Sequence, residues 1–173
     1  MNIATSLADT DSWHDFFIAA AGGAAALSGL IFVAVSINLR EILKLEAKVH
    51  SSYLTGRALE SLASLLLVLA VSLVGLDPRI TILELGAFLL FAAGGTAISP
   101  IRATRAYRQS KVKPVAFNLR FALAATLFAA YAVAGITLFI GTGGGLEWLI
   151  PAFLLAVAIA ASNAWVLLVE VLR

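Results

Sequence analysis

Residues 16–39 read FFIAAAGGAAALSGLIFVAVSINL, a run of 24 residues without a charge between Asp15 and Arg40. A helix needs about 20 apolar residues to cross the hydrocarbon core of a bilayer. The run exceeds that length and is too long for the apolar part of a secretory signal peptide. It therefore predicts a first membrane-spanning helix over about residues 13–39.

The composition of the whole chain indicates the same class of protein. Of its 173 residues, 61% are hydrophobic and only 13% are charged, whereas a soluble domain carries about 25% charged residues. Four more apolar stretches predict helices over about residues 55–76, 79–101, 115–140 and 147–171. We expect an all-α polytopic membrane protein, a single domain over residues 1–173 built as a bundle of five transmembrane helices.

The basic residues predict how this bundle is oriented. Lys and Arg gather in the segments 40–54 and 102–114, while the N-terminal tail and the GTGGG loop (residues 141–145) have none. The positive-inside rule makes the two basic segments cytoplasmic loops. Five spans then place the N-terminus outside and the C-terminus inside, and we expect the bacterial cytoplasmic (inner) membrane as the location. Because the basic residues follow the loops rather than one binding face, no nucleic acid partner is expected.

Several short motifs predict helix boundaries. Ser12 and Asp15 have the spacing of a capping box for the first helix. The pair Asp77-Pro78 predicts an N-cap and first helical residue for the third helix, and Lys113-Pro114 opens the fourth in the same way. Gly141 is expected to end the fourth helix.

One face of the first helix carries mostly small residues. At 100° per residue seven positions fall within about 80° of one another: Asp15, Gly22, Ala26, Gly29, Val33, Ser36 and Arg40. Small residues allow membrane helices to approach closely. Three interpretations are open: a helix contact inside one subunit, a self-association face, or a pore-lining stripe.

A few polar residues interrupt the other spans. Glu60 is expected in the inner leaflet, where a carboxylate is costly unless it is paired. Arg57 on the same helix and Arg120 on the fourth helix are its candidate partners, as a structural ion pair or as part of an ion path. Asn163, in the middle of the fifth span, is expected to form an interhelical hydrogen bond.

Charges near the two membrane surfaces complete the set of candidate sites. Glu84 lies near the outer end of the third helix and adds to an acidic outer face, which would concentrate cations. Arg102, Arg105 and Arg108 recur at every third residue and suggest contact with anionic lipid headgroups.

Enzymatic chemistry is not expected. Cysteine is absent, and His14 and His50 fall on opposite sides of the membrane in the predicted topology. Phosphate-binding, zinc-protease and serine-hydrolase motifs are absent from the sequence. We therefore expect no catalytic residue, no cofactor and no metal site.

Two resemblances bear on function. The run WHDFFIAAAGGAAALSGLIFVAVSINLREIL (residues 13–43), followed by TGRALESL (residues 55–62), resembles a family of small multi-pass bacterial proteins common in actinobacteria. Some of that family are labelled modulators of the FtsH protease, and the resemblance implies such a role here. LSGLIFVAV (residues 27–35) is similar to part of the pore helix of Orai calcium channels, although Ser36 or Ile37 stands where their selectivity glutamate would be.

These observations lead to two functional hypotheses. The first is a homo-oligomeric, channel-like protein in which the first helix or the region of Glu60 and Arg120 faces an ion path. The alternative is a non-enzymatic membrane adaptor that modulates a larger complex, such as a membrane protease. The expected partners are the lipid bilayer, further copies of the chain, and in the second hypothesis another membrane protein.

Overall fold

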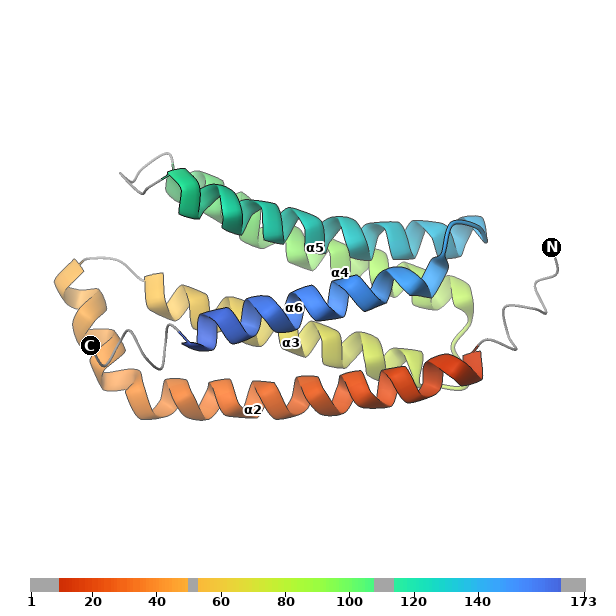
Figure 1. The fold of residues 1–173 in the computed structure, drawn as a ribbon, viewed down its shortest axis with the longest axis horizontal. Coiled ribbons are helices and arrows are strands. Elements are labelled where there is room, and N and C mark those ends of the chain that lie inside the picture. The colour runs from red at the N-terminus through yellow and green to blue at the C-terminus, as the bar shows by residue number, and fades with distance from the viewer. Residues whose placement is uncertain (1–9, 50–52, 108–113, 166–173) are drawn as a thin grey trace.

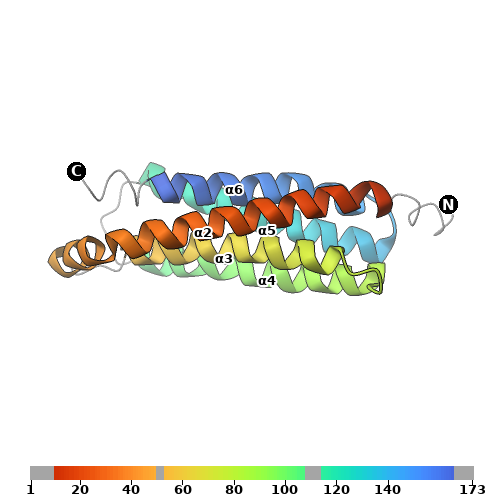
Figure 2. The ribbon, with the colours of Figure 1, turned by 90° about the horizontal axis from the view of Figure 1, so that it is seen from below.

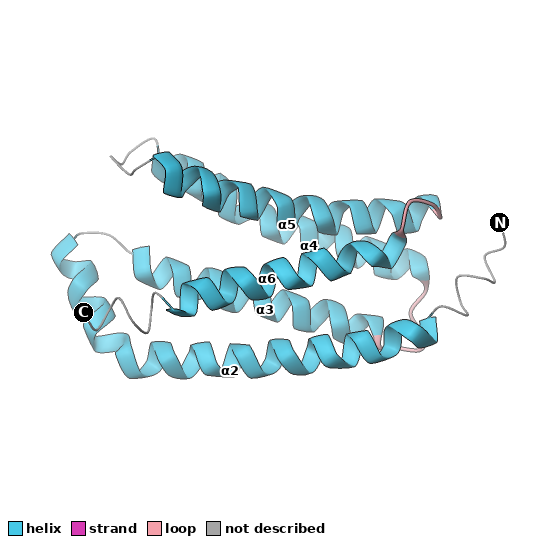
Figure 3. Ribbon diagram, in the orientation of Figure 1, coloured by secondary structure: helices cyan, strands magenta, loops and turns pink. Residues whose placement is uncertain are grey.

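The described part of the chain is helical almost throughout. The computed structural model describes residues 10–49, 53–107 and 114–165, which contain no strand (Figure 3). The long helices are α2 (Thr10–Val49), α3 (Tyr53–Gly75), α4 (Ile82–Tyr107), α5 (Pro114–Ile140) and α6 (Leu149–Trp165). A single turn of 3-10 helix, η1 (Gly145–Trp148), leads into α6. The all-α class predicted from the sequence is confirmed.

Four of these described helices contain segments that are long and apolar enough to cross a membrane. The segments are Trp13–Lys44, Ala58–Gly75, Phe121–Ile140 and Gly145–Trp165. In α4 the apolar part of the described residues, Ile82–Ala97, is shorter than a full span. The chain is thus a multi-pass membrane protein by the length and composition of its helices, and a fifth span along α4 stays a prediction.

The helices run lengthwise and form three layers (Figures 1 and 2). In Figure 1, α2 lies along one edge, α3 and α6 form the middle, and the pair α4 and α5 lies along the other edge. The start of α2 and the turns α3–α4 and α5–α6 share one end, which we call the acidic end because Asp15, Asp77, Glu84 and Glu147 belong to it. The opposite end holds the last turns of α2 and α4 and the first turns of α3 and α5, and we call it the basic end because Lys and Arg gather in these parts of the sequence.

Three groups of buried side chains hold the layers together. The main core includes residues of α2, α3, α4, α5 and α6, with Leu89, Tyr131 and Ala156 fully buried. A second group, the middle cluster, joins only α2, α3 and α6 through Ile31, Leu65 and Ala160. A third joins only α2 and α3 through Ile42 and Ala58. The pair α4 and α5 therefore shares the main core but neither of the two smaller groups.

Close packing depends on glycine at two places in the half of the bundle near the acidic end. A Cβ on Gly135 of α5 would lie 3.0 Å from the Gly86 carbonyl oxygen of α4. A Cβ on Gly75 of α3 would lie 2.7 Å from ring atoms of Phe17, which is itself buried. Glycine at these positions lets a neighbouring backbone or ring reach the helix surface, as is common where membrane helices pack.

The last turns of α2 are fixed to the start of α3. In Figure 1 this part of α2 bends from the line of the helix towards α3. The Glu46 carboxylate accepts hydrogen bonds from the backbone N–H and from the hydroxyl of Thr55, both at 2.7 Å. A carboxylate at this place satisfies an amide that has no partner inside its own helix and interacts favourably with the helix dipole. On the exposed side of α2, Lys44 pairs with Glu41, three residues before it in the chain, at 2.7 Å.

Two of the predicted helix boundaries are confirmed and two are wrong. α5 begins at Pro114 and ends at Ile140, where Gly141 follows with a φ of +73°. However, α4 begins at Ile82 rather than near residue 79, because Asp77 caps a turn instead: its carboxylate accepts a hydrogen bond from the Arg79 N–H at 2.9 Å. Helix α2 begins at Thr10, which places Ser12 inside the helix rather than before it.

Candidate functional site

A layer of buried polar side chains crosses α2, α3 and α6 on the basic side of the middle cluster. Asn38 is 6% exposed, Ser61 is 0% exposed and Asn163 is 4% exposed. Ser61 lies about one turn from Leu65 towards the basic end, and Asn163 is placed in the same way relative to Ala160. Asn163 was predicted as an interhelical hydrogen-bonding residue, and its burial on the face that packs against α2 and α3 fits that role. A polar layer inside a membrane bundle costs free energy unless it is hydrogen-bonded.

Glu60 lies next to this layer but on another face of α3. Residues at spacings of four, three and four share one side of a helix, which groups Glu60, Ser64, Leu67 and Val71. Leu67 and Val71 belong to the main core shared with α4 and α5. The face of α3 that meets α2 lies elsewhere, at Ala58, Leu62 and Leu65. Glu60 and Ser64, both half-buried, therefore continue the face of α3 that carries Leu67 and Val71.

The spacing between the helices changes along the bundle. In Figure 1 the pair α4 and α5 meets α3 and α6 near the acidic end and diverges from them towards the basic end. Side chains on α4 become less buried in the same direction: Leu89 and Ala92 are fully buried, whereas Thr96, about one turn later, is only half-buried. A Cβ on the adjacent Gly95 would have no neighbour within 4 Å.

Side chains on α5 and α6 also become less buried towards the basic end. On α5, Tyr131 and Leu127 are buried, whereas Leu123 and Ala124, one turn closer to the basic end, are half-buried. On α6, Ser162 is exposed and lies one turn beyond Ile159, which packs against the main core. We call this group of half-buried or exposed residues the wedge; its members are Glu60, Ser64, Thr96, Leu123, Ala124 and Ser162.

The two candidate partners of Glu60 belong to helices that border the wedge. Arg57 lies in the second turn of α3 and Arg120 in the second turn of α5. Their side chains lie outside the described part of the structure, so both pairs stay predictions. Since α3 packs mainly against α2, α6 and α4, a pair between Glu60 and Arg120 would have to cross the wedge.

Glu84 and Thr81, three residues apart, cap the start of α4. Its carboxylate accepts hydrogen bonds from the Thr81 N–H at 2.8 Å and the Thr81 hydroxyl at 2.9 Å. The Glu84 N–H in turn donates to the Thr81 hydroxyl at 3.3 Å. This reciprocal arrangement is a capping box at the start of α4. Glu84 is exposed at the acidic end rather than held inside the bundle.

The small-residue stripe of the first helix faces away from the rest of the chain. All seven of its positions are exposed: Asp15, Gly22, Ala26, Gly29, Val33, Ser36 and Arg40. A Cβ on Gly22 or Gly29 would have no neighbour within 4 Å. The stripe therefore makes no helix contact inside the described part of the subunit, and of the three interpretations only the two that need other copies of the chain stay open.

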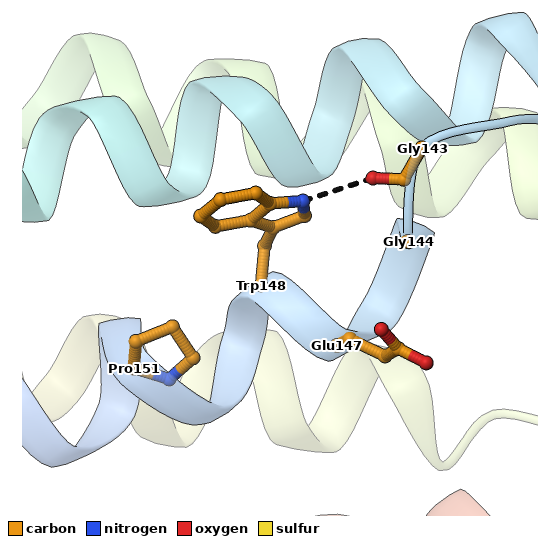
Figure 4. Close-up of a pocket in the computed structure, with 5 residues that line it drawn as sticks. All are labelled: Gly143, Gly144, Glu147, Trp148 and Pro151. Atoms are coloured by element: carbon orange, nitrogen blue, oxygen red, sulfur yellow. Dashed lines mark hydrogen bonds between the residues drawn. The ribbon is translucent and has the colours of Figure 1, made fainter.

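A shallow pocket lies at the acidic end, between α5 and the start of α6 (Figure 4). It has a volume of ≈ 440 Å³ and is lined by Gly143, Gly144, Glu147, Trp148 and Pro151. The Trp148 indole N–H donates a hydrogen bond to the Gly143 carbonyl at 3.0 Å, which fixes the ring beside the loop. Trp148 is 42% exposed, as expected for an aromatic residue at a membrane surface.

The remaining candidates for lipid contact are described only in part. Arg102 and Arg105 belong to the last turns of α4, and their side chains lie outside the described part; Arg108 lies outside it altogether. Within the described residues, no group of three or more His, Asp or Glu side chains is placed to hold a metal ion.

Several buried groups were missed from the sequence. Asn38, Ser61 and Ser72 gave no signal as buried residues, because isolated polar residues in apolar runs do not show which way they face. The Tyr131 hydroxyl is another such group: Tyr131 is fully buried, and its oxygen has no hydrogen-bond partner among the described residues.

The chain was also compared with known proteins. Models of protein families, curated proteins and solved structures give no match to it.

Proposed function

We propose that the chain crosses the bacterial cytoplasmic membrane five times, with its N-terminus outside and its C-terminus inside. The length of α4 supports the fifth span, because 26 residues at 1.5 Å per residue make a helix of about 39 Å. The charge difference between the two ends supports the orientation, because the basic end matches the positive-inside rule.

We further propose that the protein is a homo-oligomeric, channel-like protein for ion permeation. The polar residues of the wedge support this proposal, because Glu60, Ser64, Thr96 and Ser162 interrupt otherwise apolar helices. Ionisable residues inside a membrane usually face the bundle interior or a water-filled cavity and mark ion pathways.

The exposed stripe of α2 supports the oligomeric part of the proposal. Elsewhere the exposed side chains of the spans are mostly large, for example Leu66 on α3, Phe91 on α4 and Leu154 on α6. A lipid-facing helix gains nothing from small residues, whereas a helix that packs against a neighbour does. The proposal includes no enzymatic activity and no cofactor.

Ion flux in reconstituted liposomes tests the channel proposal. The native chain should conduct small ions, and Glu60→Gln should change the flux because it removes the charge from the wedge. Glu41→Gln is the matched control, since Glu41 is exposed on α2 and pairs with Lys44 outside the wedge. Equal flux in the native chain and in Glu60→Gln would contradict the assignment of Glu60.

One observation favours the alternative function, a membrane adaptor. The charged last turns of α2 extend past its apolar run and are held to α3 by the bonds between Glu46 and Thr55. Such a fixed, charged surface suits contact with a partner such as a membrane protease. Charge reversal between Arg102 and Lys113 should then abolish co-purification of that partner, and the absence of any partner with the native chain would remove this alternative.

A further inference from the structure

The pocket at the acidic end brings an aromatic ring and a carboxylate together (Figure 4). Its volume of ≈ 440 Å³ falls within the range of small-molecule sites, about 300–1,000 Å³. A Cβ on Gly144 would lie 3.2 Å from the Trp148 Nε1 atom and 3.5 Å from the Glu147 Oε2 atom. The indole and the carboxylate therefore adjoin the same point of the backbone, and one ligand can contact both.

Hydrogen bonds and a buried neighbour hold the Trp148 ring and the turn beside it. The indole N–H donates to the Gly143 carbonyl at 3.0 Å, and the Glu147 N–H donates to the Gly144 carbonyl at 2.9 Å. The next residue, Leu149, is fully buried in the main core and anchors the start of α6. Since the N–H of the indole is engaged within the loop, the ring offers its faces to a ligand.

The charges of the acidic end favour a cation in this pocket. Four exposed carboxylates belong to that end, those of Asp15, Asp77, Glu84 and Glu147, whereas Arg79 is its only Lys or Arg among the described residues. A surface of one sign attracts ligands of the opposite sign. The face of an indole also attracts cations, and organic ammonium groups are the ligands that aromatic rings recognise in this way.

The pocket lies where two segments long enough to cross a membrane meet. Phe121–Ile140 of α5 and Gly145–Trp165 of α6 are separated only by residues 141–144. So short a connection keeps the pocket at a membrane surface, whichever face of the membrane that is. Phospholipid headgroups lie at this level, where Trp is enriched.

We propose that this pocket binds an organic ammonium group, which lies against the face of the Trp148 ring and beside the Glu147 carboxylate. The headgroup of phosphatidylethanolamine carries such a group, and so do small free amines and choline. The site goes beyond the proposed function, because it requires neither ion permeation nor a particular orientation of the chain.

Titration with choline tests the recognition of the cation. The purified chain in a maltoside detergent is titrated at constant ionic strength, and saturation-transfer NMR follows the choline methyl signal. Glu147→Gln removes the charge, and Trp148→Leu removes the ring. Each should weaken binding about two- to fivefold, as expected for one exposed ion pair or one exposed cation–π contact.

Matched variants separate the pocket from general effects. Glu84→Gln removes a carboxylate of the acidic end outside the pocket, and Trp165→Leu removes an exposed ring at the other end of α6. Neither should change the dissociation constant. Trp148→Phe should bind choline more tightly than Trp148→Leu, because a smaller aromatic face remains. Equal dissociation constants in Glu147→Gln and Glu84→Gln would overturn the site.

Native mass spectrometry from nanodiscs identifies the source of the ammonium group. The discs contain equal amounts of phosphatidylethanolamine and phosphatidylglycerol, and retained lipids are counted on the native chain and on Glu147→Gln. A phosphatidylethanolamine that only the native chain retains supports a lipid headgroup as the ligand. Choline binding without a retained lipid supports a free ammonium compound, and the absence of both would overturn the proposal. Because ion flux enters neither experiment, failure here leaves the channel proposal to its own test.

Discussion

The carbonyl oxygen of Gly135 lies 3.3 Å from the point where a Cβ on Gly86 would stand, and the carbonyl oxygen of Gly86 lies 3.0 Å from the corresponding point on Gly135. The two glycines thus bring the backbones of α4 and α5 together near the acidic end. The contact between α4 and α5 is the most extensive between any two helices of the described bundle. It also lets them act as one unit that can diverge from α3 and α6 at the other end.

Gly135→Ala should destabilise the protein. The added methyl would lie 2.8 Å from the Leu90 side chain and 3.0 Å from the Gly86 carbonyl, so the Leu90 side chain must move and the Gly86 backbone must shift slightly. Overpacking of this kind costs about 1–3 kcal/mol, which thermal unfolding in detergent or lipid would measure. Gly22→Ala is the control, because its methyl would meet nothing within 4 Å. Equal stability of the two variants would contradict the close contact between α4 and α5.

Tyr131→Phe should leave stability unchanged or raise it. The change removes a buried hydroxyl that has no partner among the described residues and keeps the ring, which packs 6.4 Å from that of Phe153. An unsatisfied buried group costs about 1–3 kcal/mol, part of which the variant should recover. Ser72→Ala provides the comparison, because its hydroxyl donates to the Val68 carbonyl at 2.8 Å. A marked loss of stability in Tyr131→Phe would mean that the hydroxyl is hydrogen-bonded in the membrane.

Glu84→Gln should leave ion flux unaltered, and Glu84→Ala should loosen the first turn of α4. Glutamine keeps an oxygen that can accept bonds from Thr81, whereas alanine removes the capping box. Hydrogen exchange of the amides in residues 82–85 would measure the effect, with faster exchange expected only in Glu84→Ala. Altered flux in Glu84→Gln would instead indicate that Glu84 belongs to an ion path at the acidic end.

The sequence was sufficient for the helical class, the basic and acidic ends and the edges of α5, because these depend on local signals such as apolar length, Pro114 and Gly141. It did not show which way a helix faces. The stripe from Asp15 to Arg40 has the pattern of an internal contact, yet it is exposed, because α3 and α6 pack against the opposite side of α2 at Ala24, Ile31 and Asn38.

The candidate site shows the same limit. Glu60 and Ser61 are neighbours in sequence, but only the structure shows that Ser61 is buried whereas Glu60 is half-buried and belongs to the wedge. The contact of Gly86 with Gly135 could not be predicted from the sequence either, because nothing distinguishes these two glycines from the other small residues in the apolar runs. Pairing of this kind depends on the tertiary arrangement rather than on local pattern.

Gly29→Leu should weaken self-association while leaving the fold of the subunit intact. Leucine at this position adds bulk to the centre of the stripe, where close approach of a second helix requires a small residue. Gly23→Leu is the matched control: both glycines are exposed with open space at the Cβ position, but Gly23 lies outside the stripe. Cross-linking in membranes would measure the difference, and an equal effect of both variants would rule out the stripe as the contact.

The mass of the purified protein in lipid nanodiscs, measured by native mass spectrometry, tests the central claim most directly. A homo-oligomeric, channel-like protein predicts a single species of several 18.1 kDa subunits, which Gly29→Leu reduces and Gly23→Leu does not. A monomer for the native chain would contradict the claim, because it would leave the exposed stripe of α2 without the second copy that the proposal requires.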